Sequence, residues 1–135
     1  MGSKLELMMV LCDTNIFIHA FNGNEETIDS LKGIGFENIV LSSITVMELY
    51  QGMGNKKELE MMKKRIKYYD VIEIDERVSK LSEELIEKFA LSHGLKIPDA
   101  IIGATAIIHE IEIYTYNIKD FHYLPNIKLY KLGID

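Results

Sequence analysis

Short apolar runs alternate along the chain with longer segments in which apolar positions recur every three or four residues. A short apolar run bounded by polar residues predicts a buried strand, and the longer recurrence predicts an amphipathic helix. The expected strands cover residues 9–12, 38–41, 71–74, 111–115 and 127–130. The expected helices cover residues 14–21, 25–34, 44–53, 56–69, 76–93 and 98–110. This alternation of strands and helices predicts an α/β fold.

Capping residues and apolar stripes support several of these helices. Asp75 is a good N-cap for the segment 76–93, Gly94 is a good residue to end it, and Ser43 could cap the helix that starts near residue 44. Strands that are separated by helices cannot pair as hairpins. We therefore expect a mostly parallel central sheet, connected by right-handed crossovers and flanked by helices on both faces.

Length and composition favour one domain in a reducing compartment. The 135 residues can bury a substantial core, and no linker or repeat divides them, so residues 1–135 are expected to form a single domain. The only cysteine, Cys12, has no partner for an intramolecular disulfide, which suits the cytoplasm. No stretch is long enough to span a membrane, and the N-terminus lacks a signal peptide. Residues 1–8 could be a tag or disordered, and Met1-Gly2-Ser3 a cloning remnant.

The overall charge argues against a nucleic-acid partner unless cations or local basic patches intervene. Fifteen basic and twenty-one acidic residues leave a net charge of −6. One helical segment carries a basic cluster, which is more typical of a solvated helix face than of a phosphate-binding surface. The cluster consists of Lys63, Lys64, Arg65 and Lys67. The four histidines are scattered without the spacing of zinc ligands, and we expect none of them to be catalytic.

Three carboxylates interrupt otherwise apolar surroundings. Asp13 ends the first expected strand, Glu48 lies inside the apolar segment SSITVMELYQGM, and Asp99 opens the apolar helix PDAIIGATAII. Asp13 and Asp99 could simply stabilise helix N-termini. Glu48 is harder to explain in this way, because a buried carboxylate is costly unless it is paired or bound to a metal, and no basic residue stands within one helical turn. Together the three carboxylates predict a Mg²⁺ or Mn²⁺ site.

Four motifs resemble one known family. The segments VLCDTNIFI, LSSITVMELYQGM, IPDAIIGATAI and IYTYNIKDF occur in the order and approximate spacing of the PIN-domain ribonucleases. The resemblance runs from Val10 to about Tyr130, and it is strongest to the VapC toxins of toxin–antitoxin pairs. It implies a homodimer that cleaves RNA and forms a tight complex with a small antitoxin, whose chain would cover or enter the acidic groove.

The resemblance also assigns roles to individual residues. It implies that Asp13, Glu48 and Asp99 bind Mg²⁺ or Mn²⁺ for cleavage of RNA phosphodiester bonds. The hydroxyl of Thr14 would support this site, and Asn15 completes the family's DTN motif. A bound metal can supply an activated water, so no nucleophilic side chain is required.

The fourth acidic position of many PIN domains is replaced in this chain. The segment TYNIKDF offers Asn117, in the T-x-N form that VapC-like members often carry, with Asp120 three residues later. Asp120 could supply the fourth metal ligand while Asn117 orients the site through its amide. Alternatively, Asn117 is a turn or N-cap residue and Asp120 a solvated carboxylate.

The leading hypothesis is therefore a metal-dependent endoribonuclease that acts as the toxin of a toxin–antitoxin pair. One alternative is a phosphohydrolase or phosphotransferase with an acidic pocket, although the DTN segment lacks the second aspartate of the DxD motif found in haloacid-dehalogenase-like phosphatases. Another alternative is a PIN-like binding module without catalysis, because Asn117 stands where many PIN domains carry the fourth acidic residue.

Overall fold

Within residues 9–131, four short strands form one parallel sheet in the order β3-β2-β1-β4. The computed structural model describes residues 9–131, so the interpretation of residues 1–8 lies outside the described part of the chain. The strands are β1 (Val10–Cys12), β2 (Ile39–Ser42), β3 (Asp70–Ile72) and β4 (Glu112–Tyr114). Each of the three pairings between neighbouring strands is parallel. The prediction of a mostly parallel sheet is confirmed.

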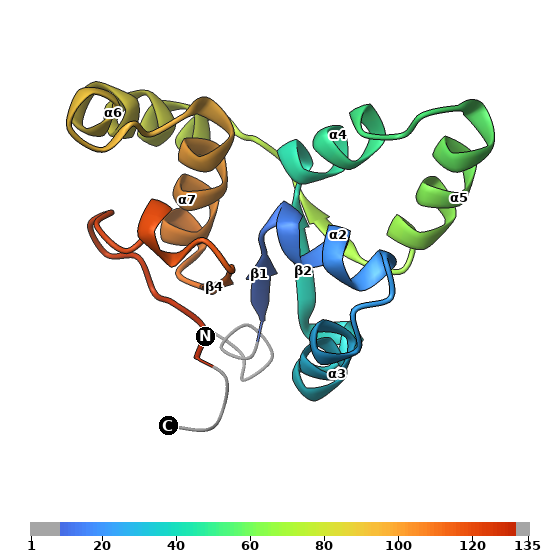
Figure 1. Cartoon of the computed structure of the whole chain (residues 1–135). Coiled ribbons are helices and arrows are strands. Elements are labelled where there is room, and N and C mark those ends of the chain that lie inside the picture. Colours follow the sequence, from blue (N-terminus) through green and yellow to red (C-terminus); the bar gives the residue numbers. More distant parts are fainter. Residues whose placement is uncertain (1–8, 132–135) are drawn as a thin grey trace.

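Helices connect the strands and cover both faces of the sheet (Figure 1). They are α2 (Thr14–Phe21), α3 (Glu25–Ile34), α4 (Ser43–Gln51), α5 (Lys56–Ile66), α6 (Glu76–His93) and α7 (Ile97–His109), with 3-10 turns η1 (Phe36–Asn38) and η2 (Ile118–Asp120). The predicted bounds of α2, α3 and α6 are confirmed, whereas α5 ends three residues earlier than predicted. Among residues 9–131, no helix combines the length and the apolar character needed to cross a membrane.

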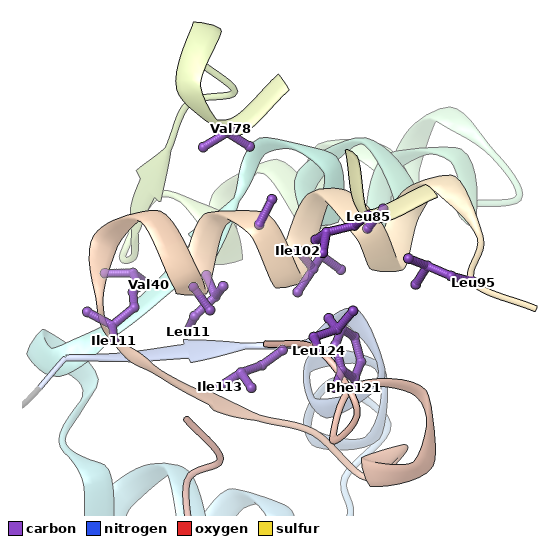
Figure 2. Close-up of a cluster of buried hydrophobic side chains, with 13 residues drawn as sticks. Leu11, Val40, Val78, Leu85, Leu95, Ile102, Ile111, Ile113, Phe121 and Leu124 are labelled. Atoms are coloured by element: carbon purple, nitrogen blue, oxygen red, sulfur yellow. The ribbon is translucent and has the colours of Figure 1, made fainter. Parts of the chain in front are cut away.

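The hydrophobic core consists of two layers, one on each face of the sheet. Side chains alternate between the faces along a strand, so Leu11 points to one layer while Val10 and Cys12 point to the other. The first layer packs against α6 and α7, and Figure 2 shows Ile102 of α7 above β1, with Phe121 and Leu124 closing the cluster. The second layer packs against α2, α3, α4 and α5. Helices on both faces leave the ends of the strands as the accessible part of the sheet.

The prediction of a strand at residues 127–130 is wrong. The segment lies beside β4 through a single parallel bridge between Ile113 and Leu129. The N–H of Ile113 donates to the carbonyl of Lys128 at 2.9 Å, and the N–H of Tyr130 donates to the carbonyl of Ile113 at 2.8 Å. The chain enters the segment through Asn126, whose φ is 66°, so it reaches β4 only briefly.

The cap of α4 differs by one residue from the prediction. Ser42 is the N-cap, and its Oγ accepts a hydrogen bond from the N–H of Ile44 at 3.2 Å. Ser43 is instead the first residue of the helix, and its hydroxyl donates to Oε1 of Glu73 at 3.1 Å. The predicted cap of α6 is confirmed, because Oδ1 of Asp75 accepts from the N–H of Val78 at 2.9 Å.

Candidate active site

The three carboxylates singled out in the sequence line one cleft at the carboxyl ends of the strands. Asp13 follows β1, Glu48 lies in α4, and Asp99 lies in the first turn of α7. The cleft has a volume of about 320 Å³. Its other lining residues are Thr14, Asn15, Ile18, Gln51, Gly52 and Asn117, so none of the described residues that line it is basic. The structure therefore brings the three acidic side chains together without a neutralising partner in the cleft wall.

Asp13 is fixed at the floor of this cleft by two hydrogen bonds. Its Oδ1 accepts from the N–H of Thr14 at 2.8 Å, which makes it the N-cap of α2. Its Oδ2 accepts from the hydroxyl of Thr115 at 2.8 Å. Asp13 is only 4% exposed, and its burial raises the pKa of its carboxyl although both hydrogen bonds oppose the shift. The charges of Glu48 and Asp120 raise this pKa further. Asp13 is thus a helix cap and a member of an acidic cluster at the same time.

Glu48 is half-buried in the same cleft and is linked to the start of α2. Its Oε1 accepts a hydrogen bond from the hydroxyl of Thr14 at 2.7 Å. The same hydroxyl oxygen lies 2.9 Å from the hydroxyl oxygen of Thr45. Thr14 therefore contacts two of the three carboxylates, because its N–H donates to Asp13 and its hydroxyl donates to Glu48.

Asp99 carries the clearest electrostatic signature in the cleft. Burial raises the pKa of its carboxyl to about 6, and the charges of Asp13, Asp120 and Glu48 contribute to the shift. Lys96 opposes the shift with the smallest effect. Near neutral pH the cleft consequently concentrates negative charge that its own residues do not balance, which is the condition under which a bound cation stabilises a group of carboxylates.

The two residues considered for the fourth position occupy different places. Asn117 lines the cleft, and its N–H donates to the hydroxyl of Thr115 at 2.9 Å. Asp120 is exposed at the end of η2 and does not line the cleft. Its charge nevertheless raises the pKa of both Asp13 and Asp99, so its carboxylate lies at the edge of the cluster. The geometry gives Asn117 an inner position and Asp120 an outer one.

The donor set suits a hard divalent cation. Carboxylate and amide oxygens are the ligands that Mg²⁺ and Mn²⁺ prefer. Within residues 9–131, however, no three acidic, histidine or cysteine side chains are already close enough to hold one ion together. The residues that line the cleft nevertheless fit such an ion by their charge and by their oxygen donors.

The four histidines and the basic residues of α5 do not line the cleft. His19 is exposed and packs its ring against Tyr116, with the ring centroids 5.2 Å apart. None of the four histidines is among the residues that line the cleft, and the basic side chains of α5 are exposed to solvent. Two threonines that hydrogen-bond to residues of the cleft, Thr45 and Thr115, were not predicted from the sequence. Thr45 precedes Glu48 by one helical turn, which was its only local signal, and Thr115 lies in the quoted segment IYTYNIKDF.

Comparisons with known proteins agree with this architecture. The sequence matches the PIN domain family over residues 10–125. Ribonuclease VapC2 of Rickettsia felis is 28% identical over 131 residues, which cover 90% of this chain and 96% of that protein. Ribonuclease VapC3 of Methanocaldococcus jannaschii is 34% identical over 91 residues, which cover 67% of this chain and 87% of that protein. The structure of a toxin–antitoxin complex from Klebsiella pneumoniae matches with a TM-score of 0.75 and 31% identity, over 91% of this chain and 99% of that chain. The chain therefore belongs to the PIN domain family.

Proposed function

We propose that this protein is a Mg²⁺- or Mn²⁺-dependent endoribonuclease and the toxin of a toxin–antitoxin pair. One observation carries the proposal: carboxylates from three separate parts of the chain, Asp13, Glu48 and Asp99, line one cleft, and none of the described residues that line it is basic. The similarity to two proteins named as VapC ribonucleases supports RNA as the substrate. The carboxylates of the cleft repel an RNA phosphate, and the net charge of the protein is −6. A bound cation would remove this repulsion and allow the phosphate to bind.

The chain's own residues would prepare the site in a defined way. Asp13, Glu48 and Asp99 would hold the ion, and the outer Asp120 would add negative charge near it. A bound divalent ion neutralises the phosphate oxygen and lowers the pKa of a bound water. The hydrogen bonds from Thr14 and Thr115 keep Asp13 in one orientation, so less reorganisation is needed when the substrate arrives.

Two amides would complete the site beside the carboxylates. Asn15 and Asn117 both line the cleft. Amide side chains donate as well as accept hydrogen bonds, so they can contact a phosphate oxygen or a ribose hydroxyl where a carboxylate would repel it. We infer that this is how the site orients the RNA backbone.

A second groove offers a place for the antitoxin. This groove has a volume of about 460 Å³, lies between α2, α4 and α5, and shares Ile18, Glu48 and Gly52 with the acidic cleft. Met53, Met61 and Met62 lie in its wall, and flexible methionine side chains adapt to an apolar segment of a partner. We propose that the antitoxin binds here and reaches the acidic cleft, that the toxin forms a homodimer, and that the pair acts in the cytoplasm.

A cleavage assay with three substrates tests the proposed activity. The protein would be incubated with structured RNA, with duplex DNA of the same sequence and with an aryl phosphate, after chelation and again after adding Mg²⁺ or Mn²⁺. We expect cleavage of RNA only, and only when a divalent ion is present. Intact length standards and a gel readout would show whether the cuts are internal.

The other results of this assay would overturn the proposal in distinct ways. Hydrolysis of the aryl phosphate without RNA cleavage would identify a phosphohydrolase with an acidic pocket. RNA binding without any turnover at saturating Mn²⁺ would identify a PIN-like binding module. Undiminished RNA cleavage in the presence of chelator would refute the metal dependence.

A metal titration would separate the roles of Asp120 and Asn117. Asp120→Asn should weaken the apparent Mg²⁺ affinity by about 3- to 10-fold while leaving activity at saturating metal nearly intact, because the variant removes negative charge from the edge of the site. Asn117→Ala should instead lower activity even at saturation, because it removes a polar group from the cleft itself. RNA cleavage measured across a range of Mg²⁺ concentrations gives both values.

The exposed Asp29 of α3 provides the control for this titration, since Asp29→Asn makes the same chemical change on a helix that does not line the cleft. Its Mg²⁺ midpoint should equal that of the wild type. An unchanged midpoint for Asp120→Asn would assign Asp120 to the solvated surface.

A further inference from the structure

The helix that carries Glu48, α4, also contains a fully buried hydroxyl, that of Thr45. Thr45 is 0% exposed and lies in the first turn of this helix, three residues before Glu48, so the two residues share one helix face. Its hydroxyl oxygen lies 2.9 Å from the hydroxyl oxygen of Thr14, which is its only side-chain partner among residues 9–131. Burying a hydroxyl is favourable only when it is hydrogen-bonded, so the contact with Thr14 satisfies Thr45.

The supply of protons decides the direction of these hydrogen bonds. The Thr14 hydroxyl has one proton and two oxygen neighbours, Oε1 of Glu48 at 2.7 Å and the hydroxyl of Thr45 at 2.9 Å. An ionised carboxylate can only accept, so the Thr14 proton belongs to Glu48. The proton between the two threonines therefore comes from Thr45. The result is a chain in which Thr45 donates to Thr14 and Thr14 donates to Glu48.

We propose that Thr45 is a positioning residue of the acidic site, which acts through Thr14 to hold the Glu48 carboxylate in its place in the cleft. Without the Thr45 hydroxyl, the Thr14 side chain loses the donor that fixes its orientation, and it can turn its own proton away from Glu48. The inference rests on the proposed function, because it gives Glu48 the task of holding a divalent ion.

Another buried threonine shows what a purely structural hydroxyl looks like in this fold. Thr105 of α7 is also 0% exposed, but its hydroxyl donates to the carbonyl of Ile101, one turn earlier in its own helix, at 2.7 Å. That local bond is the usual fate of a threonine inside a helix. The Thr45 hydroxyl instead bonds across to a different helix and to a residue that contacts two acidic side chains. Thr105→Val is therefore a matched control for Thr45→Val.

Direct Mn²⁺ binding to the full chain is the main measurement, with RNA cleavage as a function of Mn²⁺ as the second. We expect Thr45→Val to weaken Mn²⁺ binding by about 3- to 10-fold, less than the 10- to 100-fold typical of residues that hydrogen-bond a metal ligand directly, because Thr45 acts one step further away. Thr45→Ser keeps the hydroxyl and should remain within about 2-fold of the wild type. Thr105→Val should bind Mn²⁺ like the wild type.

A double-mutant cycle tests whether Thr45 acts through Thr14. In a Thr14→Val background, Thr45→Val should cause no further loss of Mn²⁺ affinity, because the chain is already broken. The proposal would be overturned if Thr45→Val lowered the Mn²⁺ affinity equally in the wild type and in the Thr14→Val background. It would also be overturned if Thr45→Val bound Mn²⁺ as tightly as the wild type. If Thr45→Val does not fold, the comparison of Thr45→Ser with Thr45→Ala replaces it, and equal Mn²⁺ affinities of those two variants would overturn the proposal.

The two readouts keep this inference separate from the proposed activity. A wild-type protein that binds Mn²⁺ but cleaves no RNA would refute the ribonuclease assignment, while the binding cycle would still decide the role of Thr45. A wild-type protein that binds no Mn²⁺ would overturn the metal site and the role of Thr45 together.

Discussion

Asp13→Asn should reduce RNA cleavage by at least about 100-fold, because mutations one step removed from a metal already cost 10- to 100-fold. Asp13 lies at the floor of the cleft, and both of its carboxylate oxygens are fixed by hydrogen bonds. The substitution removes a full negative charge but almost no volume. Asparagine is also a favourable N-cap, so the start of α2 should remain intact. The measurement is the initial rate of RNA cleavage at saturating Mg²⁺, with the circular dichroism spectrum as the test of folding.

Glu48→Gln and Asp99→Asn should cause losses of the same order, since the two residues come from different helices and line the same cleft. Asp29→Asn on α3 is the control and should retain full activity, because that residue is exposed and does not line the cleft. Undiminished cleavage by any two of the three cleft variants would refute the site assignment.

The parts of the fold that local chemistry encodes were predictable from the sequence. Both ends of α6 were expected because Asp75 can cap an N-terminus and Gly94 can adopt a left-handed conformation, and the structure shows both features. The parallel order followed from the alternation of strands and helices. These signals reside in neighbouring residues, so no knowledge of the tertiary structure was needed to interpret them.

Features that depend on pairing between distant segments were not predictable. Residues 127–130 have an alternating pattern typical of a strand, but strand formation also requires a partner along the whole segment, and β4 provides one bridge. The choice between Ser42 and Ser43 as the cap of α4 depends on where β2 ends. Ser42 still pairs with Ile72 of β3, so the strand continues one residue further than its apolar pattern indicates.

The same distinction applies to the site. Asp13, Glu48 and Asp99 were identifiable because a carboxylate is conspicuous in an apolar segment. Thr115 supports Asp13 from 102 residues away, and a threonine directly after a strand is unremarkable on its own. Residues that bind an ion are therefore easier to find in one sequence than the residues that orient them.

Asp99→Asn should stabilise the metal-free protein at neutral and alkaline pH, although it inactivates the site. The pKa of Asp99 is raised to about 6, mainly by burial and then by the charges of Asp13, Asp120 and Glu48. An unfolded chain gives an aspartate a pKa of about 3.9. The folded state therefore binds the proton more tightly, and Asp99 costs the protein stability as the pH rises from about 4 through about 6.

The expected gain in the free energy of unfolding is about 1–2 kcal/mol at pH 8. A shift of two pKa units corresponds to about 3 kcal/mol, and the partial exposure of Asp99 reduces this value through solvent screening. At pH 4 the folded wild type carries a protonated Asp99, which resembles asparagine, so the two proteins should be nearly equally stable. Urea denaturation in the presence of chelator at both pH values measures the difference.

Two further measurements connect this gain to the cation. Mg²⁺ should raise the urea midpoint of the wild type at pH 8 more than that of Asp99→Asn, because the ion relieves in the wild type the repulsion that the substitution has already removed. Asp29→Asn is the control, and its free energy of unfolding should equal that of the wild type at pH 8 and at pH 4. A loss of stability by Asp99→Asn at pH 8 would contradict this prediction. It would mean that the charged Asp99 carboxylate stabilises the metal-free fold in spite of its burial and its repulsion by the other three acids.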